Sequence, residues 1–325
     1  MVLKPFVNSR EKGVLFLNFD ETVDKFFALY DVEKIARDYR IVFEPSAWGY
    51  QQPRMFLLHG LATDVIVEAQ YLPDYNYTKE LGGALVPIRI GAGDWVDFET
   101  FRSGRDEEKQ YDLVMIANWL KWKRHKLLFK ALQKLEKEVG RVALIGYPIE
   151  GRTSSEIRQL AHKMGGGDRI DIFENISAEE VGRIIRRSKV GIMLSKKEGA
   201  NRGIYECFFS DVPVILTDQN IGVNRDHINT HTGLLAADGE LFCHIRSMLA
   251  EHDRFETRSW ALTNTGWDKS SRRLNDFLRT IAMEKQEEWT FDIFPKMNGP
   301  LPAYTNEEDR VAADRDVERL NGYLL

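Results

Sequence analysis

The sequence predicts an α/β fold built from parallel strands that helices cover on both faces. Short apolar runs rich in Val, Ile and Leu recur along the chain, and stretches with helical periodicity lie between many of them. Most of the runs lack strict alternation, which is typical of strands buried on both faces. Strands and helices that alternate in this way indicate βαβ units in doubly wound, Rossmann-type sheets.

The individual elements follow from these runs in chain order. Each run has about the length of a buried strand. The expected strands are Val14–Phe19, Arg40–Phe43, Asp64–Val67, Leu85–Ile90, Asp112–Ala117, Arg141–Ile145, Arg169–Phe173, Lys189–Leu194 and Val212–Leu216. The expected helices are Asp24–Tyr39, Lys126–Glu138, Ser154–Met164, Ala178–Ser188 and Asn201–Phe209.

The length of the chain predicts two domains. It has 325 residues, and a domain typically has roughly 100–200. A charged, apolar-poor segment at Phe98–Lys109 suggests the boundary. We therefore expect one α/β domain over 1–105 and another over 106–283. The remaining residues, 284–325, have an aromatic cluster, a Pro/Gly loop and a polar helix, and we expect them to form a strap that packs back on the body.

Composition excludes several classes of protein. The formal net charge of −5 argues against a general nucleic-acid binder, which would carry a basic excess. The two cysteines, Cys207 and Cys243, lie far apart, so neither a zinc site nor a disulfide scaffold is expected. No apolar run approaches the ~18 residues that would span a bilayer, and the N-terminus lacks the apolar core of a signal peptide. We expect a cytoplasmic protein with at most peripheral contact to the inner face of a membrane.

The most informative stretch lies around the expected helix start at Asn201. A strand runs into a loop there, and Asn is a good N-cap. Ligands bind at such carboxyl edges of open α/β sheets, and a helix N-terminus suits phosphate. Glu198 precedes the helix and Glu206 lies in its second turn, where a carboxylate can accept both hydroxyls of a ribose. The alternative is that both are solvated glutamates near a helix end.

A basic segment follows the strand Asp112–Ala117. Lys123, Arg124 and Lys126 lie directly after its carboxyl end and could neutralise a diphosphate. Arg binds phosphate through a bidentate fork, whereas Lys acts as a point charge. The alternative interpretation of this segment is a solvated helix start.

Residues from about Asp64 to Met283 resemble the retaining glycosyltransferases of the GT-B fold, family 4, also called glycosyl transferases group 1. The resemblance is carried by an ordered series of segments rather than by any one of them. The segments are GAGDWVDFETF, NWLKWKRHKLLFKAL, RVALIGY, DRIDIFENISAEEVGRIIRRSKVGIMLS, EGANRGIYECFFSDVPVIL and IGVNRDHINTHTGLL. The family's Glu-x7-Glu pattern is intact at Glu198 and Glu206, and Asp226 lies near the usual acid of the last segment.

The resemblance implies a GT-B-like fold of two Rossmann-type domains facing a cleft, with a nucleotide-sugar donor site in the second. It implies that Lys123, Arg124 and Glu198 are the catalytic residues, that the first two stabilise the departing diphosphate, and that Glu198 meets the transferred sugar. It implies that Glu206 holds the ribose. The further donor contacts that it implies are Ile172 and Phe173 at the base, Gly199, Ala200 and Asn201 around phosphate and sugar, and Asn118 at the family's arginine position.

The implied activity is transfer of a sugar from a nucleotide diphosphate, most often UDP or GDP, to an acceptor hydroxyl with retention of configuration. A glycan, a lipid-linked or a small-molecule acceptor would fit, and the resemblance implies neither a cofactor nor a metal. Two alternatives stay open: a GT-B nucleotide-sugar epimerase, and a non-catalytic sugar-nucleotide-binding protein.

The first domain departs from the family pattern. It is unusually short, and NFDETVDKF stands where the family has a glycine-rich loop. Asp20 and Glu21 at that point could bind acceptor hydroxyls or cap the following helix. His59 lies where the family often has an acceptor-side histidine, although a packed or surface histidine is the preferred interpretation.

Overall fold

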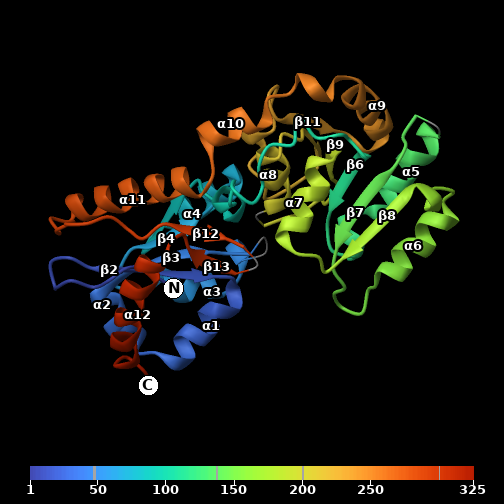
Figure 1. The fold of residues 1–325 in the computed structure, drawn as a ribbon. Helices are drawn as coiled ribbons and strands as arrows, with labels where there is room; N and C mark the ends of the chain where they lie inside the picture. Colours follow the sequence, from blue (N-terminus) through green and yellow to red (C-terminus); the bar gives the residue numbers. More distant parts are fainter. Residues whose placement is uncertain (47–48, 137, 200, 300) are drawn as a thin grey trace. The chain divides into compact units, whose positions relative to one another are not determined.

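The computed structural model describes residues 1–46, 49–136, 138–199, 201–299 and 301–325, and these divide into two compact units (Figure 1). Unit 1 combines Met1–Val96 with Thr265–Leu325, and unit 2 is Asp97–Asn264. These limits differ from the expected boundaries at 105 and 283. The first limit moves to Asp97 because Arg258 Nη1 of unit 2 donates a hydrogen bond of 2.8 Å to the carbonyl of Phe101. The second moves to Asn264 because the helix that follows packs on the sheet of unit 1.

The sheet of unit 1 has five strands in chain order. They are β1 (Val2–Lys4), β2 (Gly13–Asn18), β3 (Tyr39–Glu44), β4 (Val65–Glu68) and β5 (Leu85–Ile88). β1 pairs antiparallel with β2, and the other pairs are parallel. The connecting helices are α1 (Asp20–Leu29), α2 (Val32–Asp38), α3 (Arg54–His59) and α4 (Leu72–Leu81).

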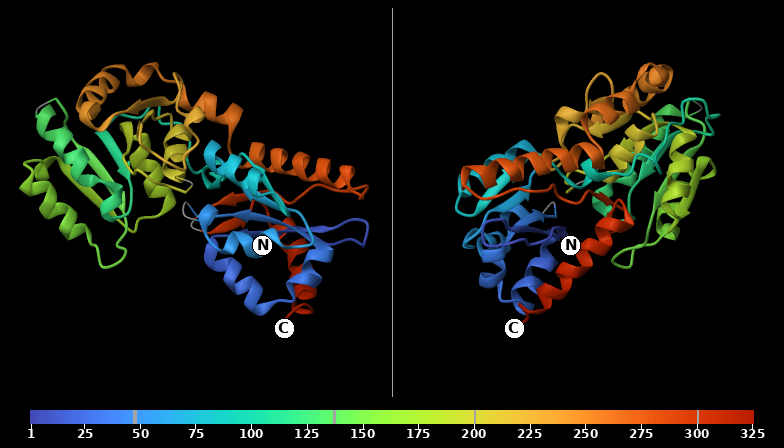
Figure 2. Two further views of the ribbon diagram at one scale, coloured as in Figure 1. Left: turned by 180° about the vertical axis from the view of Figure 1, so that it is seen from behind. Right: turned by 60° about the vertical axis from the view of Figure 1, so that its left-hand side comes forward.

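Two different parts of the chain cover the two faces of this sheet. Alternate strand residues such as Leu17 and Phe43 pack in one core cluster with Val23 of α1 and Ile35 of α2. The residues between them, such as Phe16 and Val42, pack in another core cluster with three residues of α11 (Trp267–Glu284): Leu274, Leu278 and Ile281. Figures 1 and 2 show α11 running beside the sheet. The second face is therefore buried by a helix that begins at Trp267, far beyond the last strand of this sheet, which ends at Ile88.

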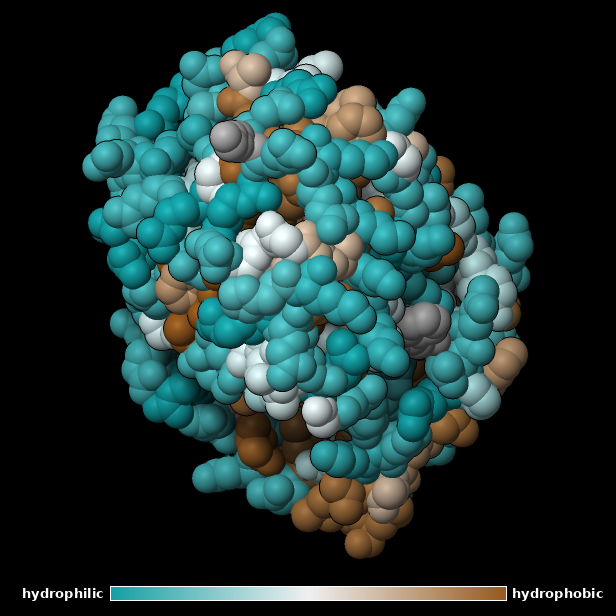
Figure 3. Space-filling model, turned by 90° about the vertical axis from the view of Figure 1, so that its right-hand side faces the viewer, coloured by the Kyte–Doolittle hydropathy of each residue, from teal (hydrophilic) through white to brown (hydrophobic). Residues whose placement is uncertain are grey.

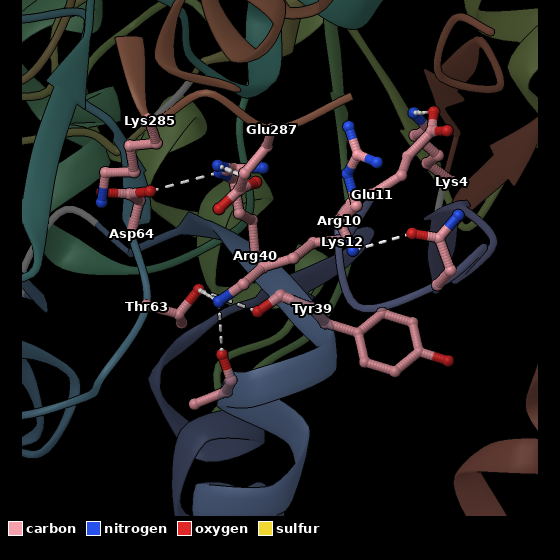
Figure 4. Close-up of polar contacts among 12 residues, drawn as sticks. Lys4, Arg10, Glu11, Lys12, Tyr39, Arg40, Thr63, Asp64, Lys285 and Glu287 are labelled. Carbon is pink, nitrogen blue, oxygen red and sulfur yellow. Dashed lines mark hydrogen bonds and ion pairs between the residues drawn. The ribbon is translucent and has the colours of Figure 1, made fainter. Parts of the chain in front are cut away.

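Buried charges fasten the segment after α11 to unit 1 (Figure 4). Arg40, which is 1% exposed, donates through Nε to Asp64 Oδ2 at 3.2 Å and through Nη2 to Glu287 at 2.5 Å. Lys285 Nζ lies 2.6 Å from the other oxygen of Asp64. Removing Asp64 or Glu287 would leave the buried charge of Arg40 with less compensation, so this network holds the tail at the amino ends of β3 and β4.

The rest of the tail forms a hairpin and a final helix. The hairpin pairs β12 (Lys296–Asn298) with β13 (Pro302–Tyr304), and α12 (Glu307–Asn321) follows. Tyr304 donates its hydroxyl to the carbonyl of Val2 at 2.7 Å, and Asp316 of α12 accepts from the Tyr39 hydroxyl at 2.7 Å. The tail thus packs on unit 1.

Unit 2 has a six-stranded parallel sheet in the order β11-β10-β9-β6-β7-β8. Its strands are β6 (Tyr111–Ile116), β7 (Val142–Gly146), β8 (Ile170–Glu174), β9 (Ser188–Met193), β10 (Val214–Thr217) and β11 (Gly233–Ala236). Its helices are α5 (His125–Leu135), α6 (Ser154–Lys163), α7 (Ala178–Arg186), α8 (Arg202–Phe209), α9 (Leu241–Glu251) and α10 (Thr257–Asn264). This is the strand order of a Rossmann-type fold.

One expected helix is divided in the structure. The stretch Asp24–Tyr39 forms α1 and α2 rather than one helix, and α1 begins earlier, at Asp20. The break falls at Asp31, whose side chain caps α2 by accepting from the backbone N–H of Lys34. The backbone N–H of Asp31 donates to the carbonyl of Tyr323 at 2.7 Å, a contact that sequence periodicity cannot predict.

Among the described residues, no helix combines the length and apolarity that crossing a membrane requires. Figure 3 shows a face on which hydrophilic side chains predominate and hydrophobic ones gather in a few small areas.

Candidate active site

The carboxyl ends of β6 and β9 form the topological switch point of unit 2. From β6 the chain continues to β7 on one side, and from β9 it continues to β10 on the other. The two segments that leave these neighbouring strands therefore diverge, and ligands of open α/β sheets bind in the crevice that such segments leave. Residues 117–124 follow β6 and residues 194–201 follow β9, so both predicted site segments start at this point.

An ion pair joins the two segments. Lys123 Nζ, at the end of a short 3-10 turn, hydrogen-bonds Glu198 Oε1 at 2.5 Å. The two side chains are only 13% and 10% exposed, so water screens their attraction weakly. The structure thus brings together a cation and a carboxylate that the sequence places 75 positions apart.

Arg124 has partners other than those expected of it. Nη1 donates to the carbonyl of Leu194 at the end of β9 at 3.0 Å, and Nη2 pairs with Asp238 after β11. The residue has a left-handed backbone, with φ 65° and ψ 35°, which non-glycine residues adopt rarely. In this structure its guanidinium therefore braces three strand-end segments, whereas the sequence assigned it to the diphosphate.

The loop that carries Glu198 is held from the neighbouring loop after β10. Asn220 Nδ2 donates to the carbonyl of Ser195 at 2.7 Å, and the Glu198 N–H donates to the carbonyl of Ile221 at 2.9 Å. Gly222 has φ 107°, and a Cβ there would lie 1.7 Å from the carbonyl oxygen of Glu198. Only glycine fits this approach, so the position of Glu198 depends on a residue outside the predicted site.

Asn201 caps α8 as the sequence predicts. Its side-chain oxygen accepts from the N–H of Ile204 at 3.3 Å, and its Nδ2 lies 3.1 Å from Met193 Sδ. Gly199 lies one residue after Glu198 in the same loop, and Ala200 lies outside the described residues. The helix start is therefore at the switch point, with its first N–H groups directed to the carboxyl edge of the sheet.

Glu206 is a buried carboxyl in the second turn of α8. It is 7% exposed, and Arg202 Nε lies 4.0 Å from its Oε1. Burial raises the pKa of Glu206 above its ordinary value, while Arg202 opposes the shift. A carboxylate that is desolvated and only distantly paired gains strongly from added hydrogen-bond donors.

The remaining predicted donor contacts lie on other strands of the sheet. Ile172 and Phe173 are both half-buried in β8, where Phe173 makes an edge contact with Tyr111 at 6.2 Å between ring centroids. Asn118 follows β6 and accepts from the N–H of Leu120 at 3.3 Å. None of the hydrogen bonds described above links these three residues to Lys123 or Glu198.

His125 begins α5 directly after the basic pair. It is 3% exposed, and its Nε2 has no hydrogen-bond partner among the described residues. Burial, together with the charges of Lys123 and Arg152, lowers the pKa of His125 to about 4. The ring is therefore neutral near pH 7, and it packs against Trp119 at 5.6 Å between centroids.

Sequence reasoning missed three residues that organise the site: Asp238, Asn220 and Gly222. Gly222 lies in the segment IGVNRDHINTHTGLL, which the sequence analysis used only for the family resemblance. Asp238 and Asn220 gave no local signal, because each acts on a backbone or side chain from another strand end. His59, by contrast, packs as preferred, with its Nε2 3.1 Å from the carbonyl of Leu81. Within the described residues, no three or more His, Cys, Asp or Glu side chains are arranged to hold a metal ion.

Comparison with known proteins identifies the family. Residues 97–258 match the family model named Glycosyl transferases group 1. No curated protein matches the chain. The sucrose-phosphate synthase of Thermosynechococcus elongatus is similar in structure, with a TM-score of 0.64, 15% identity, and coverage of 83% of this chain and 74% of that one.

Two further solved structures are similar over most of the chain. Anabaena Alr3699/HepE in complex with UDP has a TM-score of 0.65 and 14% identity, with coverage of 83% of this chain and 79% of that one. A glycosyltransferase of Rickettsia africae has a TM-score of 0.59 and 18% identity, with coverage of 76% and 70%. At these identities the structural likeness supports the fold.

These findings confirm the predicted GT-B-like fold, with two predominantly parallel sheets of five and six strands. The chain belongs to the glycosyl transferases group 1 family (family 4), and it is a glycosyltransferase.

Proposed function

We propose that this glycosyltransferase uses a nucleoside-diphosphate sugar, with UDP-glucose the first donor to test, and binds it at the β6–β9 switch point of unit 2. The observation that carries the proposal is Glu206. It is a desolvated carboxyl with its nearest cation 4.0 Å away, one and a half turns into a helix that starts at the sheet's carboxyl edge. Complexes of Anabaena HepE contain UDP, and one contains UDP-glucose, which supports this choice of donor.

In this proposal most of the predicted donor-binding residues contact a particular part of the donor. Glu206 accepts the two ribose hydroxyls, and Ile172 and Phe173 of β8 flank the base. The backbone N–H groups of Gly199, Ala200 and Asn201 receive the phosphate, since a helix N-terminus favours anions.

The chemistry is carried by charge rather than by a covalent nucleophile. Lys123 stabilises the negative charge that develops on the leaving diphosphate, and Glu198 meets the hydroxyls of the transferred hexose. Arg124 keeps the loops of Lys123 and Glu198 in place through Leu194 and Asp238. When the donor binds, its phosphate lies beside Lys123, whose counter-charge in the structure is the carboxylate of Glu198. The proposed transfer goes to an acceptor hydroxyl with retention of configuration.

Calorimetry with UDP tests the donor site. Glu206→Gln keeps the size of the side chain and removes its charge, and we expect it to weaken UDP binding by roughly 1.5–3 kcal/mol, the scale of hydrogen bonds to a charged group. Glu240→Gln is the matched control, since this carboxylate is exposed in the same unit. Equal UDP affinity in a folded Glu206→Gln variant would remove Glu206 from the nucleotide site.

Turnover assays decide among the activities. A glycosyltransferase releases UDP from UDP-glucose faster when an acceptor is added. An epimerase would convert the donor without releasing UDP, and a binding protein would bind UDP-glucose without any turnover.

A further inference from the structure

We propose that Phe19 is a stacking platform for a sugar ring of the acceptor, at the carboxyl end of β2 in unit 1. This inference rests on the proposed function. It selects a carbohydrate among the acceptors that the sequence left open, and it names a contact residue that neither the family match nor the sequence analysis assigned.

The chain's own tail covers the carboxyl end of β3. Lys296 of the β12–β13 hairpin is 1% exposed, and its Nζ lies 3.8 Å from Glu44 Oε2 at the end of β3 and 3.8 Å from the ring centre of Trp95. Asn298 donates to the same Glu44 oxygen at 3.0 Å and to the carbonyl of Ala92 at 3.3 Å. Buried side chains therefore fill the space at the carboxyl end of β3.

The end of β4 is closed as well. Glu68 is 1% exposed and accepts from Trp95 Nε1 at 3.0 Å. The Tyr50 hydroxyl donates to the backbone carbonyl of Glu68 at 2.6 Å. Ligands of α/β sheets approach the carboxyl edge, and the end of β2 is a part of this edge that neither set of contacts covers.

Phe19 stands at that end with its ring exposed. It directly follows β2 and precedes α1, and it is 48% exposed. Its backbone has φ 62° and ψ 154°, a region that is populated essentially by glycine. The strain is held by two hydrogen bonds, from the Phe19 N–H to the carbonyl of Glu44 at 2.9 Å and from the Thr22 N–H to the carbonyl of Phe19 at 3.2 Å.

Because the Phe19 ring is about half exposed, its burial contributes little free energy to offset the cost of this backbone conformation. Packing of the ring therefore does not explain the conformation. Strained non-glycine residues of this kind cluster at ligand sites, where the strain sets the direction of a side chain. The flat ring offers dispersion contacts to the C–H face of a pyranose.

Two carboxyl groups suited to sugar hydroxyls directly follow Phe19 in the chain, in the first turn of α1. Glu21 is exposed in the first turn of α1. Asp20 is 6% exposed, and its Oδ1 accepts no hydrogen bond from the described residues, while Ser46 donates to Oδ2. A Cβ at Gly49 would lie 2.1 Å from Oδ1, so only glycine fits against this buried oxygen. An aromatic face next to carboxylate acceptors is the chemistry that recognises a sugar, rather than an anionic group or a bare lipid chain.

The test measures binding of a panel of methyl glycosides to the full chain by saturation-transfer NMR and calorimetry, with and without saturating UDP. We expect saturable binding of at least one glycoside. Phe19→Ala and Phe19→Gly should weaken it about tenfold, and Phe19→Trp should stay within threefold of the wild type. Leu29→Ala is the control, because Leu29 is a hydrophobic residue of α1 that is 53% exposed.

Stability separates the proposed role from a structural one. Phe19→Gly relieves the strained backbone, so its denaturation midpoint should rise while its glycoside affinity falls. Unchanged glycoside binding in both Phe19→Ala and Phe19→Gly would overturn the proposal, and so would the absence of saturable binding to every glycoside. UDP affinity should be the same in all variants. Failure of the wild type to bind UDP would instead count against the proposed function, because the glycoside arm is read without UDP as well.

Discussion

The brace between Arg124 and Asp238 gives the sharpest prediction. Arg124→Ala removes a charged hydrogen bond to the Leu194 carbonyl and the ion pair with Asp238. A hydrogen bond to a charged group contributes roughly 1.5–3 kcal/mol. The paired side chains are 17% and 29% exposed, so solvent screening places the expected loss of unfolding free energy near the lower end of that range.

The left-handed backbone of Arg124 supplies an internal control. Arg124→Gly loses the same contacts but removes the backbone cost of a non-glycine residue at φ 65°, which is roughly 1 kcal/mol. Arg124→Gly should therefore be about 1 kcal/mol more stable than Arg124→Ala in denaturant unfolding. Asp238→Asn removes only the ion pair, and the Arg124→Ala/Asp238→Asn double variant should lose less than the sum of the single losses.

UDP calorimetry then separates a brace from a direct phosphate contact. If Arg124 positions the loops of Lys123 and Glu198, both Arg124→Ala and Asp238→Asn should weaken UDP binding. If its guanidinium binds the diphosphate directly, Arg124→Ala should weaken binding while Asp238→Asn leaves it equal or tighter. The second result, or an additive double variant, would refute the brace.

Three further predictions concern other parts of the molecule. Gly222→Ala should displace the Glu198 loop and lower turnover at least tenfold with UDP-glucose while the chain stays folded by circular dichroism, because the added Cβ would lie 1.7 Å from a carbonyl oxygen; unchanged turnover would contradict this. Burial lowers the pKa of His125 from 6.5 to about 4, so between these pH values the unfolded chain binds a proton that the folded chain does not. The free energy of unfolding should therefore fall by up to about 3 kcal/mol as the pH drops from 6.5 to 4. His125→Leu should make the melting temperature less dependent on pH in this range, and an equally steep dependence would exclude His125 as the cause. Burial raises the pKa of Glu68 to about 8, so the native state loses stability as pH rises from 4.5 to 8. The difference in melting temperature between Glu68→Gln and the wild type should therefore be more favourable to the variant at pH 9 than at pH 5. An equal difference at both pH values would show that Glu68 is not protonated in the folded chain.

Much of the second unit could be predicted from local sequence. The run Asp112–Ala117 corresponds to β6 at Tyr111–Ile116, and Lys189–Leu194 corresponds to β9 at Ser188–Met193. The central residues of these strands are buried, so the stretches Leu113–Met115 and Val190–Met193 carry no polar side chain and the pattern is easy to read. Asn201 was identifiable as a helix cap because capping depends on residues within one turn.

The contacts that assemble the site could not be predicted in the same way. The sequence singled out Lys123 and Glu198 separately, but their ion pair exists only because β6 and β9 are neighbours in the sheet. Asp238 and Asn220 carry no signal in the sequence, because their partners, Arg124 and the Ser195 carbonyl, are brought to them only by the order of the strands in the sheet. Strand order is decided by the packing of the whole sheet, which no local window contains.

Unit 1 shows the same division between local pattern and tertiary structure. Its sequence predicted the runs that become β2 to β5, since apolar β-branched and aromatic residues suit a buried pleated surface, but it did not predict β1, β12 or β13. Tertiary structure decided that α11 covers one face of the sheet and that the β12–β13 hairpin closes part of its edge. A buried face must be covered, but the apolar pattern of a strand does not specify which segment covers it. That choice depends on the free energy of packing two distant segments against one another.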